Sequence, residues 1–168
     1  TNRTDMKQLL ILSFSLLLML GANAQEKTVP SVAMKDMTGK AIDSGDFNNE
    51  GKPYIINFWA TWCSPCKREL NAIAEVYEDW VDETGVKIIA ISIDDSRTSR
   101  NVKPYVDASG WDYEVFLDEN GDFRRAMGVA APPYTFLVDG EGNIVYQHIG
   151  YNPGDEEELY EKLLEVSK

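Results

Sequence analysis

The run YIINFWATWCSPCKRE, residues 54–69, decides the fold. Its first six residues are β-branched or aromatic except for Asn57, and they follow Gly51-Lys52-Pro53, a pattern that predicts a buried central strand. Beyond the two cysteines, apolar side chains recur at helical spacing, at Leu70, Ile73, Ala74, Tyr77 and Trp80. The chain is therefore expected to pass from strand to helix through Cys63 and Cys66.

Cys63 and Cys66 are the only cysteines of the chain. As a purely structural disulfide they would add only about 2 kcal/mol, because the loop between them is so short. At the start of a helix, unpaired backbone N–H groups and the helix dipole stabilise a thiolate, which is the form that attacks disulfides. Pro65 suits the first helical turn. We therefore expect Cys63 to attack a substrate disulfide and Cys66 to resolve the mixed disulfide, leaving an internal one.

The residues on both sides of this run predict alternating strands and helices. Residues 28–47, with a turn at Thr38-Gly39-Lys40, indicate an N-terminal hairpin, and residues 134–138 and 144–148 indicate a second hairpin. Strands are further predicted at 86–93 and 113–117, and helices at 99–108, 123–127 and 155–166, the last capped by Asp155. This order predicts an α/β domain with a central mixed sheet covered on both faces.

The N-terminal residues have the pattern of a secretory signal peptide. Lys7 precedes the apolar run Leu9 to Leu20, and the small residues Ala22-Asn23-Ala24 follow. We expect residues 1–24 to be this signal, with Met6 as its natural start and residues 1–5 as an upstream remnant, and residues 25–168 to form the mature domain. The apolar run is shorter than the ~20 residues that span a bilayer, so an uncleaved membrane anchor is the less favoured alternative.

The charge of the chain limits its partners. A formal net charge of −12 disfavours nucleic acid and anionic membrane surfaces, because both need clustered Lys and Arg. Export, which in a bacterium means the periplasm, would place the cysteines where disulfides form and persist. We expect no metal and no cofactor, since a closed zinc site needs four ligands.

Two segments together carry a resemblance to a known family. NFWATWCSPCKRE at residues 57–69 and PPYTFLVDGEGNIV at residues 132–145 resemble the TlpA/ResA-like branch of the thioredoxin superfamily. The resemblance extends over nearly all of residues 25–168. It implies a thioredoxin-like fold with an extra N-terminal β-hairpin and the activity of a thiol-disulfide oxidoreductase of the protein-disulfide reductase type.

The same resemblance implies a substrate-binding segment at residues 132–134. Pro133 would be the cis-proline that faces the cysteine pair. The preceding residue pairs its backbone with an extended substrate in such folds, but Pro132 has no N–H to donate. We therefore expect substrate contacts from the Pro132 carbonyl group and from the side chains of Trp62 and Tyr134. Trp59, in contrast, is expected to pack in the core.

A carboxyl group near the cysteines is also implied. Asn57 occupies the position of a buried aspartate in thioredoxin, and an amide cannot accept a proton at neutral pH. The resemblance points instead to Glu69, which would modulate proton exchange at Cys66. A surface glutamate paired with Lys67 or Arg68 remains the alternative. For His148, the only histidine, we expect a structural or solvent-facing role, and for Asp94 and Asp95 a solvated turn rather than a border of the active site.

Two other functions fit the sequence less well. Copper-handling relatives bind Cu(I) with two thiolates, but they have three residues between the cysteines and a suitably placed histidine. Peroxiredoxins carry a Pro-x-x-x-Thr-x-x-Cys pattern whose proline is missing before Cys63. We therefore expect a monomeric enzyme that serves redox homeostasis, with disulfide-bearing exported proteins as substrates and a membrane-bound electron donor. Cytochrome c maturation is one process that the resemblance permits.

Overall fold

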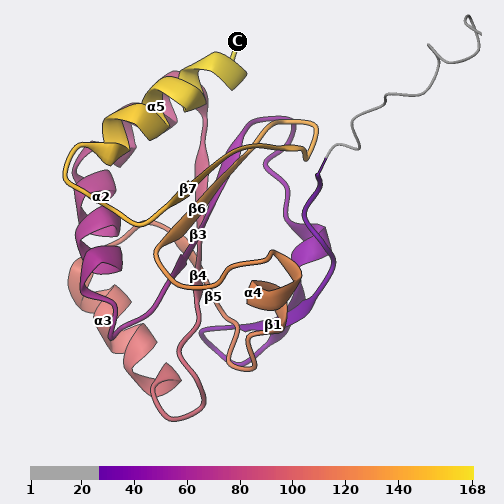
Figure 1. The fold of residues 1–168 in the computed structure, drawn as a ribbon, viewed down its shortest axis with the longest axis vertical. Helices are drawn as coiled ribbons and strands as arrows, with labels where there is room; N and C mark the ends of the chain where they lie inside the picture. The colour runs from indigo at the N-terminus through magenta and orange to yellow at the C-terminus, as the bar shows by residue number, and fades with distance from the viewer. Residues whose placement is uncertain (1–26) are drawn as a thin grey trace, which may run out of the picture.

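A computed structural model describes residues 27–168 of the chain (Figure 1). The predicted signal peptide and its cleavage site lie outside these residues. Within residues 27–168, no helix combines the length and the apolar character needed to cross a bilayer.

One mixed sheet of seven strands forms the centre of the fold. The strand order is β2-β1-β5-β4-β3-β6-β7, with β3, β4 and β5 parallel and the other neighbours antiparallel. The strands are β1 (Ala33–Asp36), β2 (Ala41–Asp43), β3 (Tyr54–Trp59), β4 (Lys87–Ser92), β5 (Glu114–Leu117), β6 (Tyr134–Val138) and β7 (Ile144–Ile149). The predicted mixed sheet and both predicted hairpins are confirmed, because β1 pairs with β2 and β6 with β7.

The helices cover both faces of this sheet, as predicted. They are α2 (Ser64–Thr84), α3 (Val102–Ser109), α4 (Asp122–Ala126) and α5 (Asp155–Val166), with short 3₁₀ turns η1 (Ser44–Asp46) and η2 (Ser99–Asn101). Figure 1 shows α2, α3 and α5 on one side of the sheet and α4 on the other. The helix α5 packs against α2.

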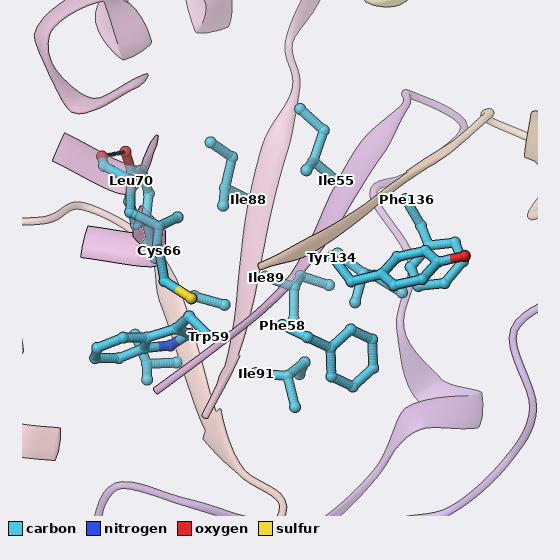
Figure 2. Packing of buried hydrophobic residues seen from close by; sticks show 14 of the residues in the cluster. Ile55, Phe58, Trp59, Cys66, Leu70, Ile88, Ile89, Ile91, Tyr134 and Phe136 are labelled. Atoms are coloured by element: carbon cyan, nitrogen blue, oxygen red, sulfur yellow. Dashed lines mark hydrogen bonds between the residues drawn. The ribbon is translucent and has the colours of Figure 1, made fainter. Parts of the chain in front are cut away.

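The strand β3 is buried along its whole length and supplies side chains to both halves of the core (Figure 2). Successive residues of a strand point to opposite faces. Phe58 packs against Phe123 of α4 and Phe136 of β6, with ring centroids 5.3 and 6.1 Å away. Trp59 instead contacts Trp111 and Tyr105, at 5.0 and 5.8 Å. The predicted core role of Trp59 is therefore confirmed.

Two helix starts differ from the prediction. The segment predicted as one helix from Ser99 divides into η2 and α3, because Pro104 has no N–H for the carbonyl of Arg100 four residues before it. Gly154, and not Asp155, is the N-cap of α5. Asp155 is the first helical residue, and its carboxylate accepts a hydrogen bond from the backbone N–H of Asn152 at 2.7 Å.

Candidate active site

The turn from β3 into α2 places the two cysteines at the start of a helix. The backbone N–H of Cys63 donates to the carbonyl of Ala60 at 3.0 Å, which closes the turn. Cys63 is then the N-cap of α2, and its Sγ accepts a hydrogen bond from the backbone N–H of Cys66 at 3.3 Å. Pro65 lies in the first helical turn, where its missing N–H leaves no partner unsatisfied. A backbone donor therefore already points at the sulfur of Cys63.

Cys63 and Cys66 are joined as a disulfide, with their Cα atoms 5.3 Å apart. The two sulfurs differ in access. Cys66 is fully buried, whereas Cys63 retains 5% of its surface at the edge of the fold. Figure 2 shows Cys66 inside the core near Trp59 and Leu70. An incoming thiol or disulfide can therefore approach Cys63 more readily than Cys66.

Glu69 lies one helical turn beyond Cys66 and is buried, with 4% of its surface exposed. Its Oε2 accepts from Nδ2 of Asn57 at 3.0 Å, and its Oε1 accepts from Oγ1 of Thr135 at 2.8 Å. The Asn57 amide also donates to the Thr135 hydroxyl at 2.8 Å. The alternative of a surface glutamate paired with Lys67 or Arg68 is therefore wrong.

The protonation of Glu69 is set by opposing effects. Burial raises the pKa of the Glu69 carboxyl, and the hydrogen bonds from Thr135 and Asn57 and the nearby His148 only partly reverse that rise. The other polar atom of Asn57, its Oδ1, is buried without a hydrogen-bond partner in the described part of the chain. A carboxyl group with a raised pKa keeps its proton to higher pH than an ordinary glutamate, and its carboxylate is a stronger base that can exchange a proton with a thiol.

Thr135 was not identified from the sequence. Strand pairing brings it to the site, because Thr135 is directly opposite Asn57 in the antiparallel pair of β3 and β6. The available signal was the position of this hydroxyl, two residues after Pro133 in a predicted strand. The register between the two strands was the missing information.

The segment before β6 forms the other side of the site. The peptide bond between Pro132 and Pro133 is cis, as the resemblance implied. Tyr134 pairs with Phe58, so Pro133 lies beside the end of β3 where the cysteine turn begins. Its carbonyl accepts from the backbone N–H of Gly150 at 2.9 Å. Pro132 is half-buried, and Trp62 is 60% exposed, so both remain accessible at this edge.

The structure places the Tyr134 side chain on the other face of the sheet from Glu69. Its side chain is only 8% exposed, and its ring is stacked on Phe136 with centroids 4.7 Å apart (Figure 2). Thr135 faces Glu69, so its neighbour Tyr134 must point to the opposite face of the sheet. The ring therefore belongs to the core on the side of α4.

Comparison with known proteins shows the family to which the chain belongs. The sequence model described as the AhpC/TSA family matches residues 26–147. The thiol-disulfide oxidoreductase ResA of Bacillus thuringiensis subsp. konkukian is 34% identical over 136 residues, which cover 81% of this chain and 76% of that protein. The chain belongs to the ResA-like thiol-disulfide oxidoreductases of the AhpC/TSA family. The ResA protein of Halalkalibacterium halodurans is 32% identical over 147 residues, or 88% of this chain and 78% of that protein.

Solved structures agree with the thioredoxin-like fold. A thioredoxin-like protein from Porphyromonas gingivalis is 53% identical, with a TM-score of 0.75 over 83% of this chain and 91% of that chain. A putative thiol:disulfide interchange protein DsbE from Chlorobium tepidum has a TM-score of 0.73 at 24% identity, over 85% of this chain and 97% of that chain. The second likeness supports the thioredoxin-like fold.

Asp94 holds the cysteine turn of this oxidoreductase and is not solvated. The carboxylate is fully buried and accepts from the backbone N–H and the hydroxyl of Thr61, at 2.8 and 2.6 Å, and from the Ser92 hydroxyl at 2.8 Å. The expectation of a solvated turn is therefore wrong for Asp94, because three donors replace the water. Asp95 does lie in an accessible turn, where it pairs with Arg97 at 2.6 Å.

His148 of the oxidoreductase is tied to the start of α5. Its Nε2 lies 3.1 Å from Oδ2 of Asp155, and its Nδ1 lies 3.4 Å from the hydroxyl of Tyr146. Within residues 27–168, no group of three or more His, Cys, Asp or Glu side chains is arranged to hold a metal ion. The side chains that the site brings together are thus those of Cys63, Cys66 and Glu69, with Asn57 and Thr135 around the carboxyl.

Proposed function

We propose that this enzyme reduces disulfide bonds of exported proteins, with Cys63 as the nucleophile and Cys66 as the resolving thiol. The observation that carries this proposal is the disulfide at the start of α2, in which Cys63 keeps 5% of its surface exposed and Cys66 none. Only a thiol that a substrate can reach can open the substrate disulfide.

The reaction proceeds in two exchanges from the dithiol form. The Cys63 thiolate attacks one sulfur of the substrate disulfide, that S–S bond breaks, and the departing thiolate takes up a proton. Cys66, after losing its proton, attacks Cys63 Sγ in the mixed disulfide and releases the second substrate sulfur as a thiol. The substrate gains two electrons and two protons, and the enzyme ends as the internal disulfide.

Glu69 has the position of the proton acceptor for Cys66. It lies one helical turn away on α2 and is held by Asn57 and Thr135. Because burial raises the pKa of Glu69, its carboxylate is a stronger base than one in water. It can therefore take the Cys66 proton as the second exchange begins.

Substrate would lie along the edge formed by Trp62 and Pro132. The exposed indole ring offers apolar contact area, and the Pro132 carbonyl can accept one backbone hydrogen bond from an extended segment. Pro132 cannot donate a second one. Substrate affinity therefore depends on Trp62 more than it would in a site with both backbone groups.

Each turnover leaves the enzyme oxidised, so a reductant must restore the dithiol. The predicted signal peptide favours action outside the cytosol, in the periplasm, where no large thiol pool is available. A membrane-bound dithiol donor fits this requirement. Cytochrome c maturation is one pathway in which a monomeric reductase of this kind would serve.

A trapping experiment tests the proposal. A Cys66→Ser variant cannot resolve the mixed disulfide, so it should accumulate in cells as adducts that dithiothreitol releases. The matched Cys63→Ser variant should form few or none, because Cys66 is buried. Equal trapping by both variants would mean that Cys63 has been wrongly assigned as the nucleophile. An absence of adducts in Cys66→Ser would count against disulfide exchange with proteins.

A further inference from the structure

His148 lies on the same side of the sheet as the buried carboxyl of Glu69. It is directly opposite Thr135 in the antiparallel pair of β6 and β7. Directly paired residues project from the same face of a sheet. Thr135 donates to Oε1 of Glu69 at 2.8 Å, so this face is the one against which α2 packs. The imidazole is therefore a neighbour of Thr135, and Thr135 contacts Glu69.

The histidine also reaches solvent, in contrast to Glu69. The side chains of His148 and of Asp155 beside it are 27% and 23% exposed. Their polar atoms are 3.1 Å apart, between β7 and the first residue of α5. Protons can thus reach His148 from water, whereas the carboxyl of Glu69 is enclosed.

We propose that His148, paired with Asp155, is a positioning residue of the exchange site that acts on Cys66 through Glu69. The inference rests on the proposed function in one respect, the role of Glu69 as proton acceptor for Cys66. It adds that the charge of this single histidine determines how readily Glu69 gives up its proton.

The charges around Glu69 give the sign of the effect. The groups that face it from the packed elements are Asn57, Tyr113, Thr135, His148, Tyr151 and Asp155. Tyr146 and Glu158 lie beyond His148, linked by a hydrogen bond of 3.1 Å. Asp155 raises the pKa of Glu69 and His148 lowers it, so the imidazolium is the cation that favours the carboxylate. Loss of the imidazole should keep Glu69 protonated to higher pH.

The competing explanation is a purely structural one, in which the pair only fastens α5 to β7. Replacement of His148 would then lower the free energy of unfolding and leave the titration of Glu69 unchanged. The two explanations thus differ in a property that a structural contact would not alter.

The first measurement follows the Glu69 carboxyl itself in the oxidised enzyme. Carbon-13 NMR of enzyme labelled at the glutamate carboxyl carbons gives its titration midpoint, with the signal assigned by its absence in Glu69→Gln. We expect His148→Gln to raise this midpoint, on the order of half a pH unit. The control Lys162→Gln removes an equal charge from the Lys162–Glu165 pair on α5 and should leave the midpoint in place. An unchanged midpoint in His148→Gln would overturn the proposal.

The second measurement follows Cys66. A mixed disulfide with glutathione is formed on Cys63 of the reduced enzyme, and the rate at which Cys66 displaces the glutathione is followed by stopped flow from pH 5 to 9. We expect His148→Gln to slow this displacement about threefold near pH 6, because Glu69 would then keep its proton to higher pH. If the Glu69 midpoint moves but the rate does not, His148 does not act on Cys66, and the proposal fails. If Glu69→Gln also leaves the rate unchanged, the failure lies instead in the proposed role of Glu69.

Discussion

Asn57 of β3 and Thr135 of β6 stand directly opposite each other, and both donate a hydrogen bond to the carboxyl group of Glu69. Two strands and one helix thus meet at a single side chain next to the buried cysteine. The carboxyl is fixed by donors on both of its oxygens, which is what a proton acceptor in an enclosed site requires.

Thr135→Val should destabilise the protein and shift the Glu69 titration, while the shape of the side chain stays the same. The substitution removes the donor to Oε1 of Glu69, and an unfulfilled buried acceptor costs about 1–3 kcal/mol. The pKa of Glu69 should rise further, because the lost hydrogen bond favoured the carboxylate. Urea unfolding and the carboxyl titration measure these two effects. Thr135→Ser retains a hydroxyl and should stay near the parent in both, so equal losses in the two variants would refute the explanation.

Glu69→Gln should change the dependence of stability on pH. Because the folded protein holds this proton more tightly than the unfolded chain, the free energy of unfolding falls as pH rises from the ordinary glutamate pKa to the raised one. Below the ordinary glutamate pKa this stabilising contribution is fully present and does not change with pH. Urea unfolding at a series of pH values should show a smaller decline for the variant than for the parent. Parallel curves would mean that Glu69 is not protonated more strongly in the fold.

Asp94→Ala should loosen the turn that presents Trp62 and Cys63. The change leaves the Thr61 backbone N–H and two hydroxyl groups without their buried acceptor, at a cost of about 2–4 kcal/mol. Urea unfolding measures the loss. The matched Asp95→Ala variant removes a carboxylate from the accessible turn and should change stability by less than about 0.5 kcal/mol. Similar losses in both would remove the special role of Asp94.

Trp62→Ala should impair substrate binding and leave the fold intact. The ring is 60% exposed, so the free energy of unfolding should change by less than about 0.5 kcal/mol. The KM for a disulfide-bonded peptide should rise about fivefold if the indole supplies about 1 kcal/mol of contact. Tyr134→Phe is the comparison, and it should leave KM unchanged because that ring is enclosed by the core. A higher KM in Tyr134→Phe would mean that substrate contacts the Tyr134 hydroxyl group.

Pro132→Thr should strengthen substrate binding. A threonine restores the backbone N–H that an extended substrate can bond, and one such bond contributes about 0.5–1.5 kcal/mol, or up to about tenfold in affinity. The effect is measured as the affinity of a disulfide-bonded peptide for the enzyme in the Cys66→Ser background. Ala131→Thr is the control, because it adds the same side chain without adding a donor. Unchanged affinity in Pro132→Thr would mean that substrate does not pair with this backbone.

The sequence was most informative where one local pattern decides the structure. The bounds of β3, residues 54–59, follow from a continuous apolar run after a Gly-Lys-Pro turn, and the position of the cysteines follows from them. Asp94 was placed in solvent because its burial depends on donors supplied by Thr61 and Ser92, one of them more than thirty residues away.

The orientation of Tyr134 could not be read from the sequence for a similar physical reason. Which side of β6 faces the site depends on the register between β3 and β6, and a single sequence does not contain that register. Once Thr135 is placed opposite Asn57, the side chain of Tyr134 must point to the other face, because successive side chains of a strand alternate between the two faces. The same register identifies Thr135 itself, and the separate register between β6 and β7 brings His148 beside it.

The turn that carries Cys63 grows out of a strand whose last two residues, Phe58 and Trp59, are anchored in opposite halves of the core. Local opening of the turn would have to disturb both halves, so it should be almost as costly as global unfolding. The hydrogen-bonded amide protons of α2 beyond its first turn should therefore exchange with solvent at rates close to those of β3, and proteases should find no cleavage site in the turn. The reactive sulfur is presented by one of the most rigid parts of the molecule.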